Sequence, residues 1–296
     1  MHSSNQGPAR FAAEVMRARA LAAVILGLLA SGTGLSQTQA SDAVPAKRLK
    51  QVLFIGDEKG YRHEAISHAM ATVERLGRET GLWATHLRTD TEPLTKKKLE
   101  YNAKNLNDFD AVIFYTGGTL QMDEQQKADL LSFVREDGKG FLGIHSAAIT
   151  FVQWPAYGEM LGGYFDEHPW GTFEAPIVVE DAGFPGMQKW PAAFQMTDEI
   201  YQIRNYSREN TRVLMRLDET KVDLSNKKVK RADRDFAVSW AKNYGHGRVF
   251  YTTLGHVPAN WDRPDFQAMI IGAIQWATRQ VDADITPRPM PASARK

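Results

Sequence analysis

The sequence predicts an α/β fold of three layers, in which helices cover both faces of a mainly parallel β-sheet. In the N-terminal half of the 296-residue chain, short apolar runs alternate with helix-compatible stretches, a pattern typical of βαβ units. Right-handed crossovers between such strands place helices on both faces of the sheet. In the C-terminal half several strand-like runs follow one another closely, which predicts antiparallel additions to the sheet.

Four apolar runs in the first half have the length of buried strands. After the first of them, apolar residues recur at near-helical spacing from Ile66 to Leu76, and Gly81 marks the end of that helix. A second helix is predicted over 123–136, and the polar stretch 94–101 is also compatible with a helix. The predicted strands are 50–55, 83–87, 109–115 and 140–144.

The second half is predicted to contain two further helices, a hairpin and a set of short strands. Residues 154–161 and 264–280 have helical patterns. The segments 236–241 and 248–253 flank a loop that contains glycine, which predicts a β-hairpin. The proline-rich segment 282–296 is expected to be a disordered tail, so the domain spans 50–281. Further strands are predicted over 173–179, 200–204 and 212–217.

Composition excludes several classes of protein. A net charge of +1 gives no electrostatic reason to expect nucleic acid or an anionic membrane as a partner. The basic run at 227–234 is interpreted as a solvated loop. The chain has no cysteine, which excludes disulfides, cysteine-ligated zinc and a thiol nucleophile. No P-loop motif occurs, so that type of nucleotide site is not predicted.

The N-terminal segment has the pattern of a secretory signal peptide. Arg17 and Arg19 precede a short apolar run, which small and polar residues follow. That run is about half of the ~20 residues that a membrane span needs, so no stable membrane anchor is expected. Translation starts at Met1 or at Met16, which directly precedes the basic residues. We therefore predict a periplasmic or secreted protein with a signal peptide over 1–40 and a linker over 41–49.

Three of the eight histidines, His63, His145 and His256, lie where predicted strands run out into loops. In an open α/β sheet, ligands bind outside the carboxyl ends of the strands, so neighbouring parallel strands would bring these imidazoles together. His168, in a loop rich in acidic and aromatic residues, is a fourth candidate, with a solvated loop as the alternative. We predict that all four are catalytic and that His145 is the leading acid or base, unless it only shapes its loop.

The same four imidazoles, with a carboxylate, would also suit a divalent metal such as zinc. No short-range signature such as H-E-x-x-H is present in the sequence. The metal hypothesis therefore depends on the fold bringing distant histidines together.

Five further side chains are assigned to substrate binding. Glu199 lies just before a predicted strand and would orient an imidazole or act as an acid, with exposed charge as the alternative. Arg62 offers a fork of donors to a hydroxyl-rich or anionic ligand, or forms a surface ion pair. Trp154 and Trp261 would stack on a sugar, or only pack. Ser146 lies in a turn like a nucleophile elbow, but no ordered Ser–acid–His series supports a serine hydrolase.

Five short segments carry a family resemblance by their order and spacing: 60–63, 143–147, 165–169, 198–201 and 247–256. Together they resemble the ThuA-like (trehalose-utilisation) family, which has a flavodoxin-related fold like that of class I glutamine amidotransferases. The resemblance covers about 51–280 and implies a role in the metabolism of disaccharides or oxidised keto sugars. It adds Tyr61 and Tyr201 to the residues expected to bind the sugar. Amidotransferase relatives have a cysteine at the elbow where this chain has His145, so no thioester can form and glutaminase activity is excluded.

Two hypotheses about function remain open from the sequence. The first is an exported hydrolase, lyase or isomerase that acts on a small carbohydrate through the histidines. The second is a non-catalytic sugar-binding or accessory protein of the cell envelope that uses the same residues. Product formation distinguishes them.

Overall fold

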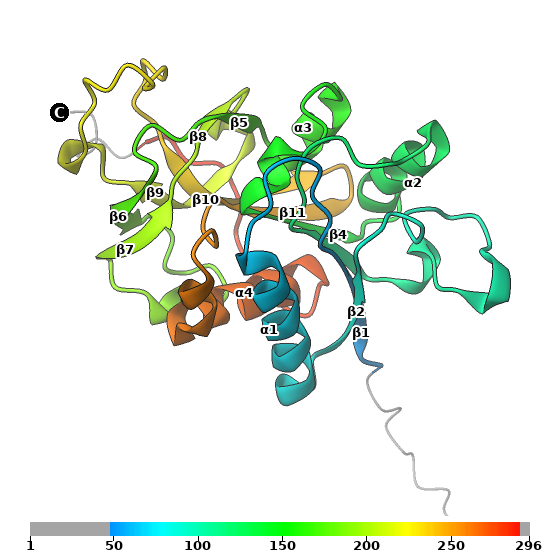
Figure 1. The fold of residues 1–296 in the computed structure, drawn as a ribbon. Helices are drawn as coiled ribbons and strands as arrows, with labels where there is room; N and C mark the ends of the chain where they lie inside the picture. Colours follow the sequence, from blue (N-terminus) through cyan, green and yellow to red (C-terminus); the bar gives the residue numbers. More distant parts are fainter. Residues whose placement is uncertain (1–47, 291–296) are drawn as a thin grey trace, which may run out of the picture. The chain divides into compact units, whose positions relative to one another are not determined.

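The computed structural model describes residues 48–290, which form an α/β domain (Figure 1). The predicted signal peptide, most of the predicted linker and residues 291–296 of the predicted tail lie outside the described residues. Within them, no helix is long and apolar enough to cross a lipid bilayer.

The main sheet has nine strands in the order β2-β1-β3-β4-β11-β10-β9-β6-β7, and β5 and β8 form a second, two-stranded sheet. From β2 to β11 all neighbours are parallel, and from β11 to β7 all neighbours are antiparallel. The bounds are β1 Lys50–Ile55, β2 Trp83–Arg88, β3 Ala111–Phe114, β4 Gly140–Ile144, β5 Tyr164–Glu167, β6 Thr172–Val179, β7 Ala193–Glu199, β8 Gln202–Arg204, β9 Arg212–Leu217, β10 Ala237–Tyr244 and β11 Gly247–Thr252.

The strand order sets the direction of β7. The steps from β11 to β10, β9, β6 and β7 are all antiparallel. An even number of reversals restores the original direction, so β7 runs the same way as β11. The carboxyl end of β7 therefore faces the same side as the carboxyl ends of β1, β4 and β11.

Helices cover both faces of the sheet (Figure 1). The helices α1 (Ala65–Thr80) and α4 (Pro264–Ala277) pack into one hydrophobic core, and α2 (Glu124–Arg135) and α3 (Pro155–Leu161) pack into the other. The central strands are apolar on both sides because both sides are covered: Val52 to Ile55 of β1, for example, are fully buried. The predicted three-layer α/β fold with antiparallel additions is confirmed.

Local signals explain where the helices begin and end. Asp123 accepts a hydrogen bond from the backbone N–H of Gln126, whose side chain accepts one from the N–H of Asp123, so α2 starts at a capping box. Gly81 ends α1 with φ 65°, a conformation that glycine adopts at little cost. Both α3 and α4 have a proline in the first turn, where its missing N–H costs nothing.

Three details of the predicted secondary structure are wrong. Residues 94–101 form no α-helix, because the Asp129 carboxylate accepts the hydroxyl of Thr95 and the backbone N–H of Lys96 and ties this segment to α2. The strand predicted over 200–204 covers only Gln202–Arg204 (β8). The strand β7 before it was not predicted, because polar and apolar residues alternate only weakly along it. The segment before His168 was predicted to be a loop, but its residues 164–167 form the strand β5.

The predicted disordered tail packs against the domain over part of its length. Residues 282–290 have no helix or strand. However, Ala283 and Ile285 lie on the apolar core, and the carbonyl of Thr286 accepts a hydrogen bond from Arg212 at 2.7 Å. Two apolar side chains and one buried guanidinium therefore hold this proline-rich segment in place.

A Gly272→Ala substitution is expected to lower the free energy of unfolding by about 1 kcal/mol. A Cβ atom at Gly272 would lie 2.1 Å from the carbonyl oxygen of Pro185, so backbone would have to move. Overpacking of this kind costs about 1–3 kcal/mol and outweighs the gain of roughly 1 kcal/mol in helix propensity. Chemical denaturation measures the change. In the control Gly183→Ala the new Cβ meets only the side chain of Asp181, at 3.2 Å, and stability should stay within about 0.5 kcal/mol; equal losses in both variants would contradict the argument.

Candidate active site

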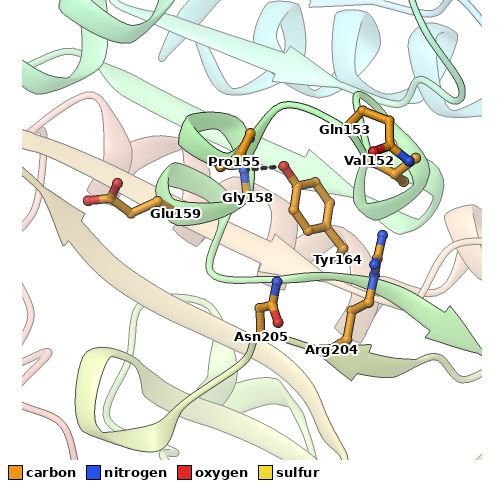
Figure 2. A pocket seen from close by; sticks show the side chains of 8 residues that line it. All are labelled: Val152, Gln153, Pro155, Gly158, Glu159, Tyr164, Arg204 and Asn205. Atoms are coloured by element: carbon orange, nitrogen blue, oxygen red, sulfur yellow. Dashed lines mark hydrogen bonds between the residues drawn. The ribbon is translucent and has the colours of Figure 1, made fainter.

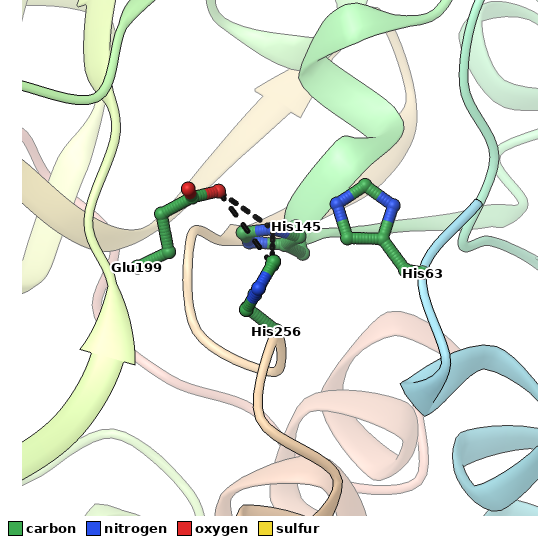
Figure 3. Close-up of side chains that lie close together, drawn as sticks. All are labelled: His63, His145, Glu199 and His256. Carbon is green, nitrogen blue, oxygen red and sulfur yellow. Dashed lines mark hydrogen bonds and ion pairs between the residues drawn. The ribbon is translucent and has the colours of Figure 1, made fainter. Parts of the chain in front are cut away.

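Four ionisable side chains from distant parts of the chain meet beyond the carboxyl ends of the strands (Figure 3). His63 follows β1, His145 follows β4, Glu199 ends β7 and His256 follows β11. One nitrogen or oxygen atom of each lies within 4.8 Å of those of the other three. We call these four residues the His/Glu cluster. The convergence of His63, His145 and His256 follows from their positions at strand ends, as expected from the sequence.

His145 is the innermost member of the cluster. It is fully buried, and its Nδ1 lies 2.5 Å from the carbonyl oxygen of Thr253. A carbonyl oxygen only accepts, so Nδ1 carries the hydrogen and Nε2 has the lone pair. Nε2 lies 2.7 Å from the hydroxyl of Tyr201 and 3.1 Å from Nδ1 of His256. The backbone of His145 has φ 44°, a left-handed conformation that turns the chain sharply off β4.

Glu58 holds His63 in place. Its Oε1 lies 2.6 Å from Nδ1 of His63, and its Oε2 accepts the backbone N–H of His63 at 2.7 Å. The hydroxyl of Ser146 also donates to Oε1 at 2.8 Å. With a carboxylate as partner, Nδ1 of His63 carries the hydrogen and its Nε2 keeps a lone pair. Ser146 is fully buried and serves this support, and the structure does not present its hydroxyl at the surface.

Asp198 holds the loop that carries His256. This fully buried carboxylate accepts backbone N–H groups from Gly255 at 2.7 Å, from His256 at 3.0 Å and from Val257 at 3.3 Å. It also accepts the side-chain amide of Asn260 at 3.0 Å and the N–H of its neighbour Glu199 at 2.9 Å. One side chain at the end of β7 thus fixes the loop after β11.

Glu199 connects the cluster to His168. Its Oε2 lies 3.5 Å from Nε2 of His145 and 3.6 Å from Nδ1 of His256, and its Oε1 lies 3.5 Å from Nδ1 of His168. His168 belongs to the border of the site, because the set of mutually close ligand atoms does not include it. Of the four predicted catalytic histidines, three are therefore in the cluster and one is next to it.

Burial dominates the electrostatics of the site. It lowers the pKa of His145 to about 4, although hydrogen bonds with Glu199 and Thr253 favour the charged form. The pKa of His256 is also lowered by burial. Burial raises the pKa of Glu199, but its contact with His145 and the positive charge that the neighbouring imidazoles can take up outweigh burial and leave that pKa below its usual value. At neutral pH the cluster therefore combines a carboxylate with neutral His145 and His256.

Two side chains that contact the cluster, Tyr61 and His168, are exposed to solvent wholly or in part. Tyr61 is 71% exposed, and its ring centroid lies 4.7 Å from that of His63 and 6.4 Å from that of His256. The side chain of His168 is 37% exposed, whereas that of Glu199 is 13% exposed. Arg62 is exposed next to Tyr61. An exposed aromatic ring and a partly exposed imidazole therefore border the cluster.

The structure places the two predicted tryptophans in packing positions. Trp154 lies just before α3, and its ring packs on Phe151 and Tyr157. Trp261 is fully buried, stacks near Tyr115 and donates to the carbonyl of Gly255 at 3.1 Å. Trp261 thus packs against the loop that carries His256, and its ring is not exposed to a sugar. Tyr201 was also predicted to bind substrate hydroxyls. It is buried and its hydroxyl contacts His145, so that hydroxyl is not exposed to a substrate.

Sequence reasoning missed Glu58. A signal for it existed, because Glu58 follows β1 at the carboxyl edge of the sheet just as His63 does. The sequence shows no reason to pair the two, since the contact depends on how the loop 56–64 folds back on itself.

A separate cavity of about 450 Å³ lies between α3 and the small β5–β8 sheet (Figure 2). Tyr164, Glu159 and Arg204 are among its lining residues, and the hydroxyl of Tyr164 accepts the backbone N–H of Gly158 at 3.0 Å. No residue that lines this cavity belongs to the His/Glu cluster. The cavity and the cluster are therefore two distinct features of the domain.

Comparison with known proteins identifies the family. The family model of ThuA, described as trehalose utilisation, matches residues 51–277. The chain belongs to the ThuA family. The match includes all four residues of the His/Glu cluster. The resemblance inferred from the sequence is therefore confirmed, and so is the connection of this family with carbohydrate utilisation.

Solved structures of other ThuA-like proteins have the same fold. One from Bacteroides uniformis has a TM-score of 0.63 and 21% sequence identity, and the match covers 80% of this chain and 94% of that chain. One from Parabacteroides merdae has a TM-score of 0.60 and 16% identity, with 83% and 94% covered. At these identities the likeness establishes the fold. The search of curated proteins finds no match.

Proposed function

We propose that this ThuA-family chain is an exported enzyme that acts on a small carbohydrate, a disaccharide or a keto sugar, at the His/Glu cluster. The reaction class is hydrolysis, elimination or isomerisation, which all need a proton taken from one atom and returned to another. The observation that carries the proposal is the convergence of His63, His145, Glu199 and His256 at one edge of the sheet. The signal-peptide pattern before residue 41 supports export to the periplasm or beyond.

The roles we propose follow from exposure and charge. Glu199 is charged and partly exposed, so it is the base that takes a proton from the sugar. His168 is more exposed and lies 3.5 Å from Glu199, so it is placed to return a proton. His145 is fully buried, so it acts through the other members of the cluster and does not touch the sugar as the leading acid or base. The exposed residues Tyr61 and Arg62, which precede His63 in the chain, contact the ring face and the hydroxyl groups.

A Glu199→Gln variant tests the proposal. The substitution keeps the shape of the side chain and removes the charge, so we expect turnover of trehalose or its keto derivatives to fall at least about 10²-fold. The rate of product formation by the purified protein is the measurement. Glu159→Gln is the matched control, because Glu159 is exposed at the separate cavity, and its turnover should not change.

Two results would contradict the proposal, the first in its assignment of Glu199 as the base and the second in the enzyme activity itself. One is a Glu199→Gln variant that turns over as fast as the wild type. The other is sugar-dependent thermal stabilisation of the wild type with no product after long incubation, which would favour the sugar-binding protein.

A further inference from the structure

We propose that the His/Glu cluster is a binding site for one divalent transition-metal ion, of the type represented by zinc. The ligand atoms would be Nε2 of His63, Nε2 of His145, Nδ1 of His256 and Oε2 of Glu199, whose Oε1 stays directed toward His168. Ion binding is measured without turnover, so this proposal stands apart from the identity of the substrate. An ion held here would polarise a sugar carbonyl or hydroxyl oxygen.

The distances within the cluster fit a tetrahedral ion. Zinc–nitrogen bonds of ~2.0–2.1 Å place two ligand atoms of a tetrahedral site about 3.3 Å apart. Nε2 of His145, Nδ1 of His256 and Oε2 of Glu199 are separated by 3.1, 3.5 and 3.6 Å. His63 completes the set, with all ligand atoms within 4.8 Å of one another. A shift of less than about 2 Å at His63 is enough to close the fourth position.

Hydrogen bonds hold two of the imidazoles in the form that a metal requires. A metal-ligating histidine donates its other ring N–H to a carboxylate or a backbone carbonyl. His63 donates Nδ1–H to Glu58, and His145 donates Nδ1–H to the carbonyl of Thr253. Both Nε2 atoms are therefore left with lone pairs. The hydroxyl of Tyr201, which donates to Nε2 of His145, can turn its hydrogen away when an ion takes that lone pair.

The donor types select the kind of ion. Three imidazoles and one carboxylate suit zinc and its neighbours in the first transition row. Calcium and magnesium require mainly oxygen ligands, so they are poor fits. The Glu199 carboxylate and the neutral imidazoles of His145 and His256 also hold electron-rich atoms close together, and a cation between them relieves that repulsion.

The test is metal titration of the full chain without a histidine tag. The chain is stripped with a chelator and dialysed, and Zn²⁺ binding is then followed by calorimetry. Co²⁺ is added in a parallel sample, because a tetrahedral site gives it visible absorption bands. We expect one ion per chain, and at least a tenfold loss of Zn²⁺ affinity in His63→Gln and in Glu199→Gln. Glu58→Gln, which weakens the support of His63 and leaves all four ligands in place, should lose about 10–100-fold.

The matched controls are His246→Gln, at the exposed hairpin turn, and Glu159→Gln. Both should bind Zn²⁺ as the wild type does. The absence of a stoichiometric ion in the wild type, or equal affinity in the His63, Glu199 and control variants, would overturn the site. If a variant fails to fold, as shown by circular dichroism, the wild-type stoichiometry and the Co²⁺ spectrum still decide. A bound ion without carbohydrate turnover would support this site and contradict the proposed enzyme.

Discussion

An Asp198→Ala variant is expected to lose about 3–5 kcal/mol of unfolding free energy at pH 8. Asp198 is fully buried and accepts five N–H donors, four of them from the segment Gly255–Asn260 and one from Glu199. Each donor left without an acceptor costs about 1–3 kcal/mol, and water that enters the space recovers part of the total. Urea denaturation at pH 8 measures the loss.

Two further variants make this prediction specific. Asp198→Asn keeps the volume and one acceptor oxygen, so it should lose less than Asp198→Ala. Asp262→Ala removes an exposed carboxylate that pairs with His68, and it should change stability by less than about 1 kcal/mol. If Asp198→Ala were no less stable than Asp262→Ala, Asp198 would not hold the loop.

The parallel half of the fold was predictable because its signals are local and strong. Fully apolar runs such as Val52 to Ile55 indicate strands covered on both faces. The carboxyl-end rule then places the residues after β1, β4 and β11 at one edge. That is why His63, His145 and His256 could be grouped from the sequence although up to 193 positions separate them (256 − 63).

The position of Glu199 could not be predicted in the same way. It depends on β7, whose pattern has only Phe194 and Met196 as large apolar residues. It also depends on the antiparallel steps that bring β7 into the direction of β11. The antiparallel additions were expected, but no residue pattern indicates how many reversals there are. Long-range pairing of this kind becomes visible only when the whole sheet is assembled.

Side-chain burial was the second limit. Trp261 and Tyr201 lie in the predicted site segments, yet both are buried beneath the loops they support. Aromatic residues in a functional loop are as useful for packing as for binding, and the sequence does not distinguish the two. The exposed ring beside the cluster is that of Tyr61, which the sequence indicated only through family resemblance.

The burial of His145 leads to a prediction for the metal-free protein. Its pKa is about 4 in the folded chain and 6.5 in an unfolded reference. As pH falls through this interval, the unfolded chain takes up the proton first, so the folded state loses stability. The contribution of neutral His145 is complete above pH 6.5 and is lost toward pH 4, and a difference of 2.5 pKa units corresponds to about 3 kcal/mol.

Protonation of Asp198 has the opposite effect on the stability of the folded state over the same pH interval. Burial raises its pKa to about 6, against the N–H donors that lower it, from a reference value of 3.8. The folded state therefore binds this proton more tightly and gains stability as pH falls below 6. The pH dependence of the wild type alone would mix both effects, so the measurement must compare two proteins.

His145→Asn is the variant that separates them. Asparagine tolerates the left-handed conformation with φ 44°, and its side-chain N–H can still donate to the carbonyl of Thr253, but it does not titrate. With a chelator present, the stability of the wild type relative to His145→Asn should fall by about 3 kcal/mol between pH 6.5 and pH 4. Asp198 contributes equally to both proteins and cancels. Parallel stability curves for the two proteins would mean that His145 takes up its proton in the folded chain as readily as in water, and that its burial does not keep it neutral.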